Sequence, residues 1–232
     1  MNHRLVNVFQ MKNNVVNYTE DDYQKNRHPE FFKSNKLSQA WSVYAYLEYL
    51  KKARNKDILE FGGALGYNLL EAVKYNRVVM IEPSPIGRKI AQTSGIVTYC
   101  DIQEMNTDKE HLFDVILCRH VLEHVHNPLI VLENFKSLLK PEGTLILILP
   151  CEKQLKPVKN EIDFHLYCWT PRTANNLLCS AGFNNTKWKY NYFTGKRLYY
   201  LVYQILGGKA YYWCIKLTGK IFNAKEMVFI TQ

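Results

Sequence analysis

Glycines and acidic residues gather where apolar runs end in the first half of the chain. The run DILEF contains Glu60 and leads at once into the turn GGALG, which supplies Gly62, Gly63 and Gly66. A turn without bulky side chains lets the backbone approach a ligand closely, and a carboxylate before it can pair with an ammonium group or a backbone amide. Glu82 ends the run VVMIE about twenty residues later, a spacing at which a carboxylate can accept both hydroxyl protons of a ribose. A purely structural strand-to-helix turn remains the alternative interpretation.

Two histidines follow apolar runs further along the chain, and a histidine can act as a base. His120 comes shortly after the apolar run FDVILC, and His165 lies in the segment DFHLYCWTP that follows the apolar run TLILILP. A base positioned at an acceptor hydroxyl contributes about 10²- to 10⁴-fold to a rate. A structural role for His165, and capping or surface roles for His124 and His126, stay open.

The chain carries no grouping of residues typical of a metal site. Its six cysteines are scattered without a C-x-x-C pair, and no histidine cluster has zinc spacing. The sequence therefore predicts no metal site, and it predicts reduced, mostly packed thiols in a cytoplasmic protein.

Alternating strand and helix patterns position these residues. Helical spacing begins near Leu37 and recurs in the segments YNLLEAVKY, SPIGRKIAQTSG, LIVLENFKSLLK and TPRTANNLLCSAGF. Strand patterns are DILEF, RVVMIEP, IVTYCD, FDVILC, TLILILP, residues 186–193 and the final KEMVFITQ. Several of these strands are apolar on both faces, which predicts an α/β fold with a mostly parallel sheet covered by helices on both sides.

Five of these segments, in this order, resemble the class I S-adenosylmethionine-dependent methyltransferases, particularly the branch with ubiquinone-biosynthesis O-methyltransferases and many small-molecule and sugar methyltransferases. The segments are DILEFGGALG, VVMIE, IVTYCDI, FDVILCRHVLEHVHNP and LLKPEGTLILILP, and the resemblance covers residues 37–193. The fourth is the most family-specific, and in the family it leads into a V-L-E-H-V-like helix. The sequence departs from the pattern at Ala64, where the middle glycine is usual.

The resemblance implies a Rossmann-like sheet of seven strands with the last strand antiparallel, and S-adenosylmethionine as the cofactor. Asp101 and Ile102 resemble the family's adenine site, and a helix cap or loop role is the alternative for Asp101. The cofactor-binding residues that the resemblance implies are Glu60, Gly62, Gly63, Gly66, Glu82, Pro83, Asp101, Ile102, Cys118 and Arg119.

The implied reaction moves a methyl group from the sulfonium to a small-molecule acceptor, with a hydroxyl of a sugar, nucleotide-linked sugar or related metabolite expected. His165 is the first candidate base and His120 the second, and no divalent cation is expected to be needed. A non-catalytic protein of the same fold and a nucleic-acid methyltransferase are the alternatives. A nicotinamide-dependent oxidoreductase is disfavoured because Ala64 and Tyr67 occupy the second and third positions of a G-x-G-x-x-G motif.

Composition limits the remaining possibilities. The 232 residues are 47% hydrophobic and 22% charged, which predicts one folded domain over residues 37–232 after an N-terminal extension over residues 1–36. The net charge of +9 suits an anionic partner without choosing one. An aromatic and basic insertion is expected at residues 195–224. Residues 198–217 are a poor spanning helix that could still lie on a membrane surface.

Overall fold

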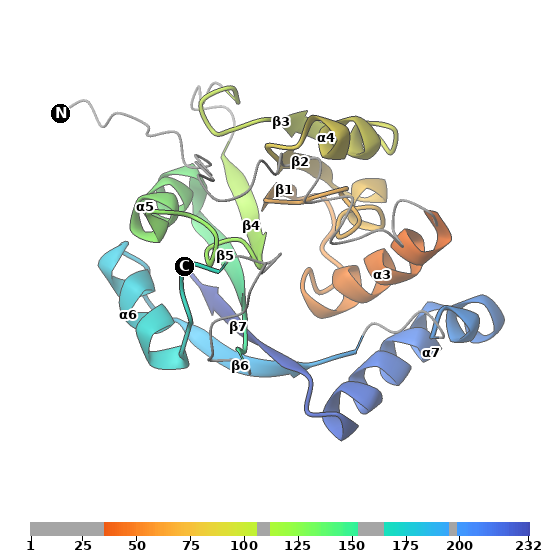
Figure 1. Ribbon diagram of the computed structural model, residues 1–232. Helices are drawn as coiled ribbons and strands as arrows, with labels where there is room; N and C mark the ends of the chain where they lie inside the picture. Colours follow the sequence, from red (N-terminus) through yellow and green to blue (C-terminus); the bar gives the residue numbers. More distant parts are fainter. Residues whose placement is uncertain (1–34, 106–111, 153–164, 195–198) are drawn as a thin grey trace, which may run out of the picture.

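The central sheet has seven strands in the order β3-β2-β1-β4-β5-β7-β6 (Figure 1). The computed structural model describes residues 35–105, 112–152, 165–194 and 199–232. Strands β1 to β5 are parallel, whereas β7 lies antiparallel between β5 and β6. The predicted Rossmann-like fold is therefore confirmed, including its antiparallel last strand. The strands are β1 (Asp57–Phe61), β2 (Arg77–Ile81), β3 (Val97–Tyr99), β4 (Phe113–Arg119), β5 (Leu139–Pro150), β6 (Lys187–Tyr192) and β7 (Lys225–Thr231).

Helices cover both faces of this sheet. On one face, α5 (Pro128–Leu138) and α6 (Pro171–Ser180) pack with the strands into one apolar cluster. On the other face, a second cluster contains residues from α3 (Asn35–Glu48), α4 (Pro85–Gln92) and α7 (Tyr199–Ile221). The middle of β1 and of β4 is thus covered on both faces, which is why Ile58 and Leu59 in β1 and residues 115–118 in β4 are apolar.

Local signals place the helix starts. Thr170 forms a capping box with Thr173 at the start of α6, and Pro171 occupies the first turn. Ser84 and Asn127 cap α4 and α5 in the same way, each accepting a hydrogen bond from a backbone amide in the first turn. The helices that follow the strands are therefore fixed by short polar signals in the sequence.

Three predicted elements differ from the structure. Residues 67–75, expected as a helix, form turns and one short 3₁₀ helix (Ala72–Lys74), because the Asn68 side chain is bound by Trp41 and Glu60. Residues 121–125 form turns instead of a helix, since the backbone of Glu123 accepts a hydrogen bond from Leu166. β5 begins at Leu139, which pairs with Phe113 ahead of a register shift, so Pro141 and Gly143 lie inside the strand.

The remaining predictions on domain organisation are placed as follows. The N-terminal extension over residues 1–36 falls outside the described residues except for its last two. The insertion at 195–224 contains α7, which lies outermost beside α3 (Figure 1). Within the described residues, no helix is both long and apolar enough to cross a membrane.

Candidate functional site

The glycine turn after β1 has the backbone geometry expected of a ligand-binding loop. Gly62 and Gly66 adopt positive φ angles of 74° and 76°. A Cβ on Gly62 would lie 2.3 Å from Cγ2 of Val121, so only glycine fits there. Ala64 also has a positive φ, 51°, a backbone conformation that favours glycine.

Only one of the two carboxylate oxygens of Glu60, the last acid before this turn, accepts a hydrogen bond within the described residues. Its Oε1 accepts a hydrogen bond from Nδ2 of Asn68, and Oδ1 of the same Asn68 accepts one from the Trp41 indole of α3. Its Oε2 is buried without a hydrogen-bond partner among the described residues, and burial raises the pKa of the carboxyl to about 7. A buried carboxylate oxygen without a partner is costly. The site therefore fits a ligand that brings an ammonium or N–H group to Glu60.

Glu82, at the end of β2, ties the glycine turn to the next strand. Its Oε2 accepts a hydrogen bond from the Ala64 amide at 2.7 Å, and its Oε1 accepts one from the Ser84 amide at 2.9 Å. Burial raises the pKa of this carboxyl to about 7 as well. Each oxygen keeps a second lone pair, so the carboxylate could still accept ribose hydroxyls. Pro83 directly follows, and its carbonyl oxygen accepts a hydrogen bond from Arg88.

Asp101 and Ile102 follow β3 on the same edge of the sheet. The Asp101 carboxylate accepts a hydrogen bond from the Glu104 amide at 2.7 Å, and Ile102 is buried in the core. The loop role weighed for Asp101 is thus present, and its second carboxylate oxygen could serve an adenine amine. The ends of β1, β2 and β3 thus bring the predicted cofactor-binding acids to one edge of the sheet.

Arg119, at the end of β4, forms an ion pair with Glu226 of the last strand, β7. Arg119 lies 3.3 Å from Oε2 of Glu226 on β7, with its guanidinium over the rings of Trp41, Tyr49 and Phe193. Burial alone would raise the pKa of Glu226, but Arg119 and His120 outweigh it and bring that pKa to about 2. Cys118 is fully buried among apolar side chains, and this burial raises the pKa of its thiol.

His120 is held in an unusual conformation beside the same carboxylate. Its φ is 54°, and its Nε2 lies 3.1 Å from Oε2 of Glu226. Burial and the neighbouring Arg119 charge lower the pKa of His120, although Glu226 raises it in part. The imidazole is therefore kept neutral near pH 7, the state in which a histidine accepts a proton.

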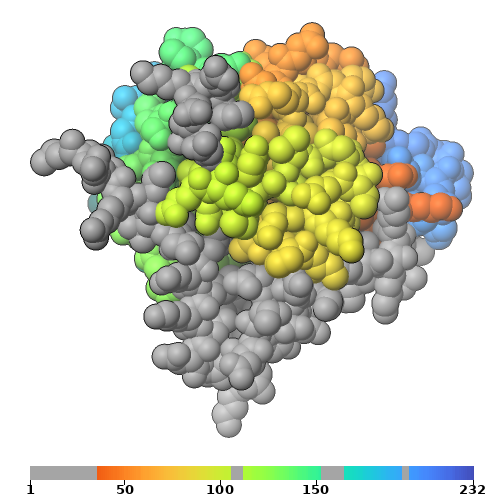
Figure 2. Space-filling model, turned by 90° about the horizontal axis from the view of Figure 1, so that it is seen from above, coloured from red at the N-terminus to blue at the C-terminus, as the bar shows by residue number. Residues whose placement is uncertain are grey.

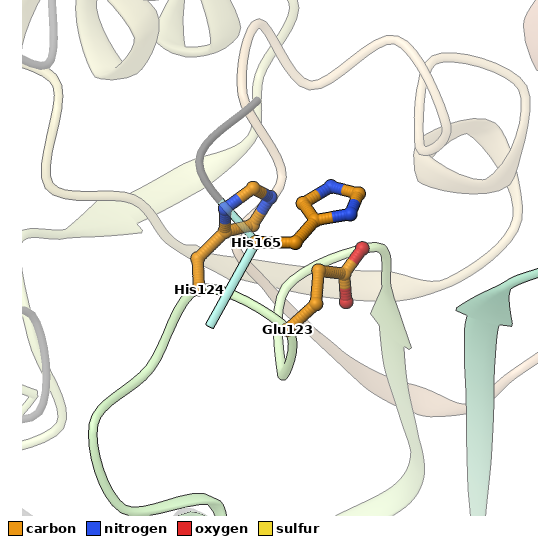
Figure 3. A group of neighbouring side chains, drawn as sticks. All are labelled: Glu123, His124 and His165. Carbon is orange, nitrogen blue, oxygen red and sulfur yellow. The ribbon is translucent and has the colours of Figure 1, made fainter. Parts of the chain in front are cut away.

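A second group of side chains surrounds His165 (Figure 3). His165, Glu123 and His124 each offer a ligand atom, and these atoms lie within 4.8 Å of one another. Nδ1 of His165 also lies 2.5 Å from Oε1 of Glu152, just after β5. A carboxylate at one ring nitrogen commonly orients the other toward a metal, so this set could hold a divalent cation.

Sequence reasoning missed the carboxylates beside both histidines. Glu226 is 107 positions from Arg119 and lies in the last strand, so no local spacing links the two. The predicted absence of a metal site rested on linear spacing, and it overlooked that Glu123 and His124 meet a histidine 41 positions further on, His165. The available signal was a buried-strand pattern that contains an acid, MVFIT preceded by Glu226.

Comparison with known proteins identifies the family. The sequence profile of a methyltransferase-domain family matches residues 23–188, which is more than half of the chain. The chain belongs to the S-adenosylmethionine-dependent methyltransferases. The glycine turn, Glu60 in β1 and Glu82 after β2 are the residues that the sequence resemblance assigns to the cofactor site, and this assignment stays a prediction.

Several methyltransferases resemble this chain more specifically. A ubiquinone biosynthesis O-methyltransferase of Histophilus somni is 27% identical over 189 residues, which cover 65% of this chain and 76% of that relative. One of Actinobacillus pleuropneumoniae is 39% identical over 71 residues, 28% of this chain, and the match spans only 30% of that relative's length. The local match is therefore closer than the overall one.

Solved methyltransferase structures share the fold. The phosphoethanolamine N-methyltransferase 2 of Haemonchus contortus, solved with S-adenosylhomocysteine, has a TM-score of 0.61 at 13% identity and covers 92% of this chain and 60% of its own. A possible histamine N-methyltransferase of Thermotoga maritima has a TM-score of 0.57 at 18% identity, covering 75% of this chain and 87% of its own. At these identities the likeness concerns the fold.

Proposed function

We propose that this methyltransferase transfers a methyl group from S-adenosylmethionine to a hydroxyl of a small-molecule acceptor, such as a sugar, a nucleotide-linked sugar or a related metabolite. The observation that carries the proposal is the presence of a buried carboxylate, Glu60, and a partly buried histidine, His120, at one edge of the sheet. Glu60 presents a carboxylate oxygen without a partner at the glycine turn, and His120 is held neutral by its surroundings at the neighbouring strand end.

The donor side follows from the residues after β1, β2 and β3. When bound, S-adenosylmethionine supplies a methyl group already activated by its sulfonium. Glu60 binds the amino end of the donor, Glu82 the ribose, and Asp101 with Ile102 the adenine. Because the methyl group needs no further activation, the chain contributes mainly by holding donor and acceptor in line, an effect of about 7–11 kcal/mol.

The acceptor side uses His120 as the base. Nε2 of His120 lies 3.1 Å from the Glu226 carboxylate without meeting hydrogen-bond geometry, and the negative charge there favours the tautomer that carries its proton on Nε2, which leaves the lone pair on Nδ1. Nδ1 would then take the proton that the acceptor hydroxyl loses as its oxygen bonds to the methyl carbon, while the sulfur–methyl bond breaks and S-adenosylhomocysteine leaves. His165, the first candidate from sequence, takes the second place because its ring is engaged by Glu152 in the possible cation set.

An acceptor screen followed by matched histidine variants tests this proposal. Sugars, nucleotide-linked sugars and amine controls are incubated with labelled S-adenosylmethionine, and the best acceptor is then used for single-turnover assays. We expect His120→Gln to lower the transfer rate about 10²- to 10⁴-fold while the affinity for S-adenosylhomocysteine stays unchanged. His126→Gln is the control, because His126 is exposed on the same segment.

The pH dependence gives the assay a second readout. A base must be deprotonated, so the transfer rate falls as the pH drops through the lowered pKa of His120, and the acid limb lies below the usual value of about 6.5. A His120→Gln enzyme with an unchanged rate and profile would remove the base role from His120. Loss of turnover in His165→Ala alone would return that role to His165.

A further inference from the structure

Exposed apolar side chains concentrate in one segment of the molecule. Among the described residues, seven of the eleven large hydrophobic side chains that are exposed lie between positions 201 and 222. This segment is α7 and the residue after it, and it forms one rim of the molecule (blue in Figure 2). The seven are Leu201, Ile205, Leu206, Trp213, Leu217, Ile221 and Phe222, with exposed fractions between 50% and 77%.

The second half of α7 has two apolar stripes, one facing the protein and one facing solvent. Its inner stripe, formed by Tyr211, Ile215 and Gly219, is buried against the rest of the protein. Trp213, Leu217 and Ile221 recur at the same interval of four residues but start two positions later, which turns them about 200° away. The helix therefore has an apolar inner stripe that folds the protein and an apolar outer stripe that the described chain leaves in solvent.

Charge on this helix has a single sign. The α7 sequence YYLVYQILGGKAYYWCIKLTGKI contains three lysines and no aspartate or glutamate. Lys209 and Lys220 are exposed and stand near the two ends of the outer stripe, whereas Lys216 turns inward to the Glu48 carboxylate. Tyrosines and a tryptophan accompany them, and such amphipathic rings favour the boundary between water and lipid.

We propose that the outer face of α7, defined as Ile205, Leu206, Lys209, Trp213, Leu217, Lys220 and Ile221, docks the protein on an anionic lipid membrane. α7 bends at Gly207, whose φ of 78° and ψ of −178° are not helical, so it consists of two helical segments. The second segment lies in the plane of the interface with Trp213, Leu217 and Ile221 among the acyl chains, and the first segment adds Ile205 and Leu206. The lysines lie at the acidic headgroups. This proposal does not depend on the proposed methyl transfer.

Charge complementarity selects this occupant over a second copy of the chain. Two copies packed by this face would bring lysines against lysines with no acid on α7 to offset them. Lipid headgroups supply the missing negative charge over the whole length of the helix, and acyl chains accept the apolar stripe without requiring a complementary shape. An anionic lipid surface thus accommodates both the apolar stripe and the positive charge of α7.

Vesicle sedimentation of the full chain tests the proposal. Vesicles of phosphatidylcholine with 30% phosphatidylglycerol are compared with vesicles of phosphatidylcholine alone, at low and at physiological salt. We expect binding to the anionic vesicles, weaker binding at higher salt, and at least tenfold weaker binding to the neutral vesicles. Tryptophan emission should shift to the blue on binding and be quenched by brominated lipids, because Trp213 enters the acyl region.

Matched variants assign the binding to α7. Lys209→Glu/Lys220→Glu should weaken binding to anionic vesicles by a factor of about 10 or more, since each basic residue near such a surface contributes about fivefold. Trp213→Asp should abolish binding, whereas Trp188→Asp, the same change at an exposed tryptophan on β6, should leave it intact. Melting curves establish that each variant folds, and the lysine pair leaves the apolar stripe unchanged.

Three results would overturn the proposal. They are absence of binding to anionic vesicles by the folded wild-type chain, binding that both α7 variants retain, and a dimer in light scattering that Trp213→Asp converts to a monomer without any vesicle binding. The last result would assign the face to a second copy of the chain.

Discussion

The donor half and the acceptor half of the site are built in different ways. On the donor side, the acid, the glycines and the next acid follow one another within residues 60–82, and each lies where a strand ends. On the acceptor side, His120 lies beside Glu226 from the last strand, and His165 lies beside Glu152, which is 13 positions away in the sequence. The residues of the donor half form a local sequence pattern, whereas the partners in the acceptor half are brought together only by the fold. For this reason the sequence indicates the donor residues together but does not reveal which carboxylates lie beside the two histidines.

Glu226→Gln tests the acceptor half and carries the largest expected effect. Removing one partner of a buried ion pair leaves the other uncompensated, so we expect a loss of about 3–5 kcal/mol in the free energy of unfolding. The Arg119 side chain would remain charged and largely buried after it has lost its carboxylate partner. Urea unfolding measures the change, with Glu133→Gln on the exposed side of α5 as control. Equal free energies of unfolding for the two variants would show that the Arg119–Glu226 ion pair does not stabilise the acceptor half.

Gly62→Ala tests the donor half. The new methyl group would meet Val121 at 2.3 Å in a backbone conformation that alanine rarely adopts, so we expect a loss of about 1–3 kcal/mol from overpacking and weaker cofactor binding. Gly95→Ala is a matched control, because Gly95 has a similar φ of 80° with nothing within 4 Å of the added Cβ. Calorimetric titration with S-adenosylhomocysteine should separate the two variants. Equal affinities would contradict a close approach at Gly62.

Cation binding tests the part of the acceptor half around His165. We expect Co²⁺ to bind at Glu123, His124 and His165, with a visible absorption band, and Glu152→Gln to weaken it about 10- to 100-fold. Titration of the chelator-treated protein measures both. The sequence-based prediction that transfer needs no cation is a separate one. Transfer abolished by chelation and restored by a divalent cation would overturn it.

The smallest effect is expected at the one departure from the glycine pattern. Ala64→Gly should stabilise the turn by up to about 1 kcal/mol, because a non-glycine residue at positive φ is strained. Thermal unfolding measures this difference against wild type. A destabilised variant would mean that the Ala64 methyl group packs usefully in the core, where it is largely buried.

The sequence predicted the seven strands, their crossover helices and the donor acids because each signal lies within about twenty residues. It failed where partners are distant. The turns at 121–125 look helical in isolation, but Leu166 binds the Glu123 backbone and His120 adopts a left-handed conformation. The helix expected at 67–75 failed for the same reason, since Asn68 is held by Trp41 of α3. Tertiary contacts override local propensity at such positions.

Calorimetry with S-adenosylhomocysteine tests the central claim most directly, which is that Glu60 and the glycine turn form a working cofactor site. We predict binding by the wild-type protein, weaker binding by Glu60→Gln and Glu82→Ala, and unchanged binding by Glu133→Gln. Because the pKa of Glu60 is about 7, its charged form is lost as the pH falls, and affinity should drop between pH 8 and pH 6. Absence of binding by the folded wild-type protein, together with binding of a nicotinamide dinucleotide, would contradict the account.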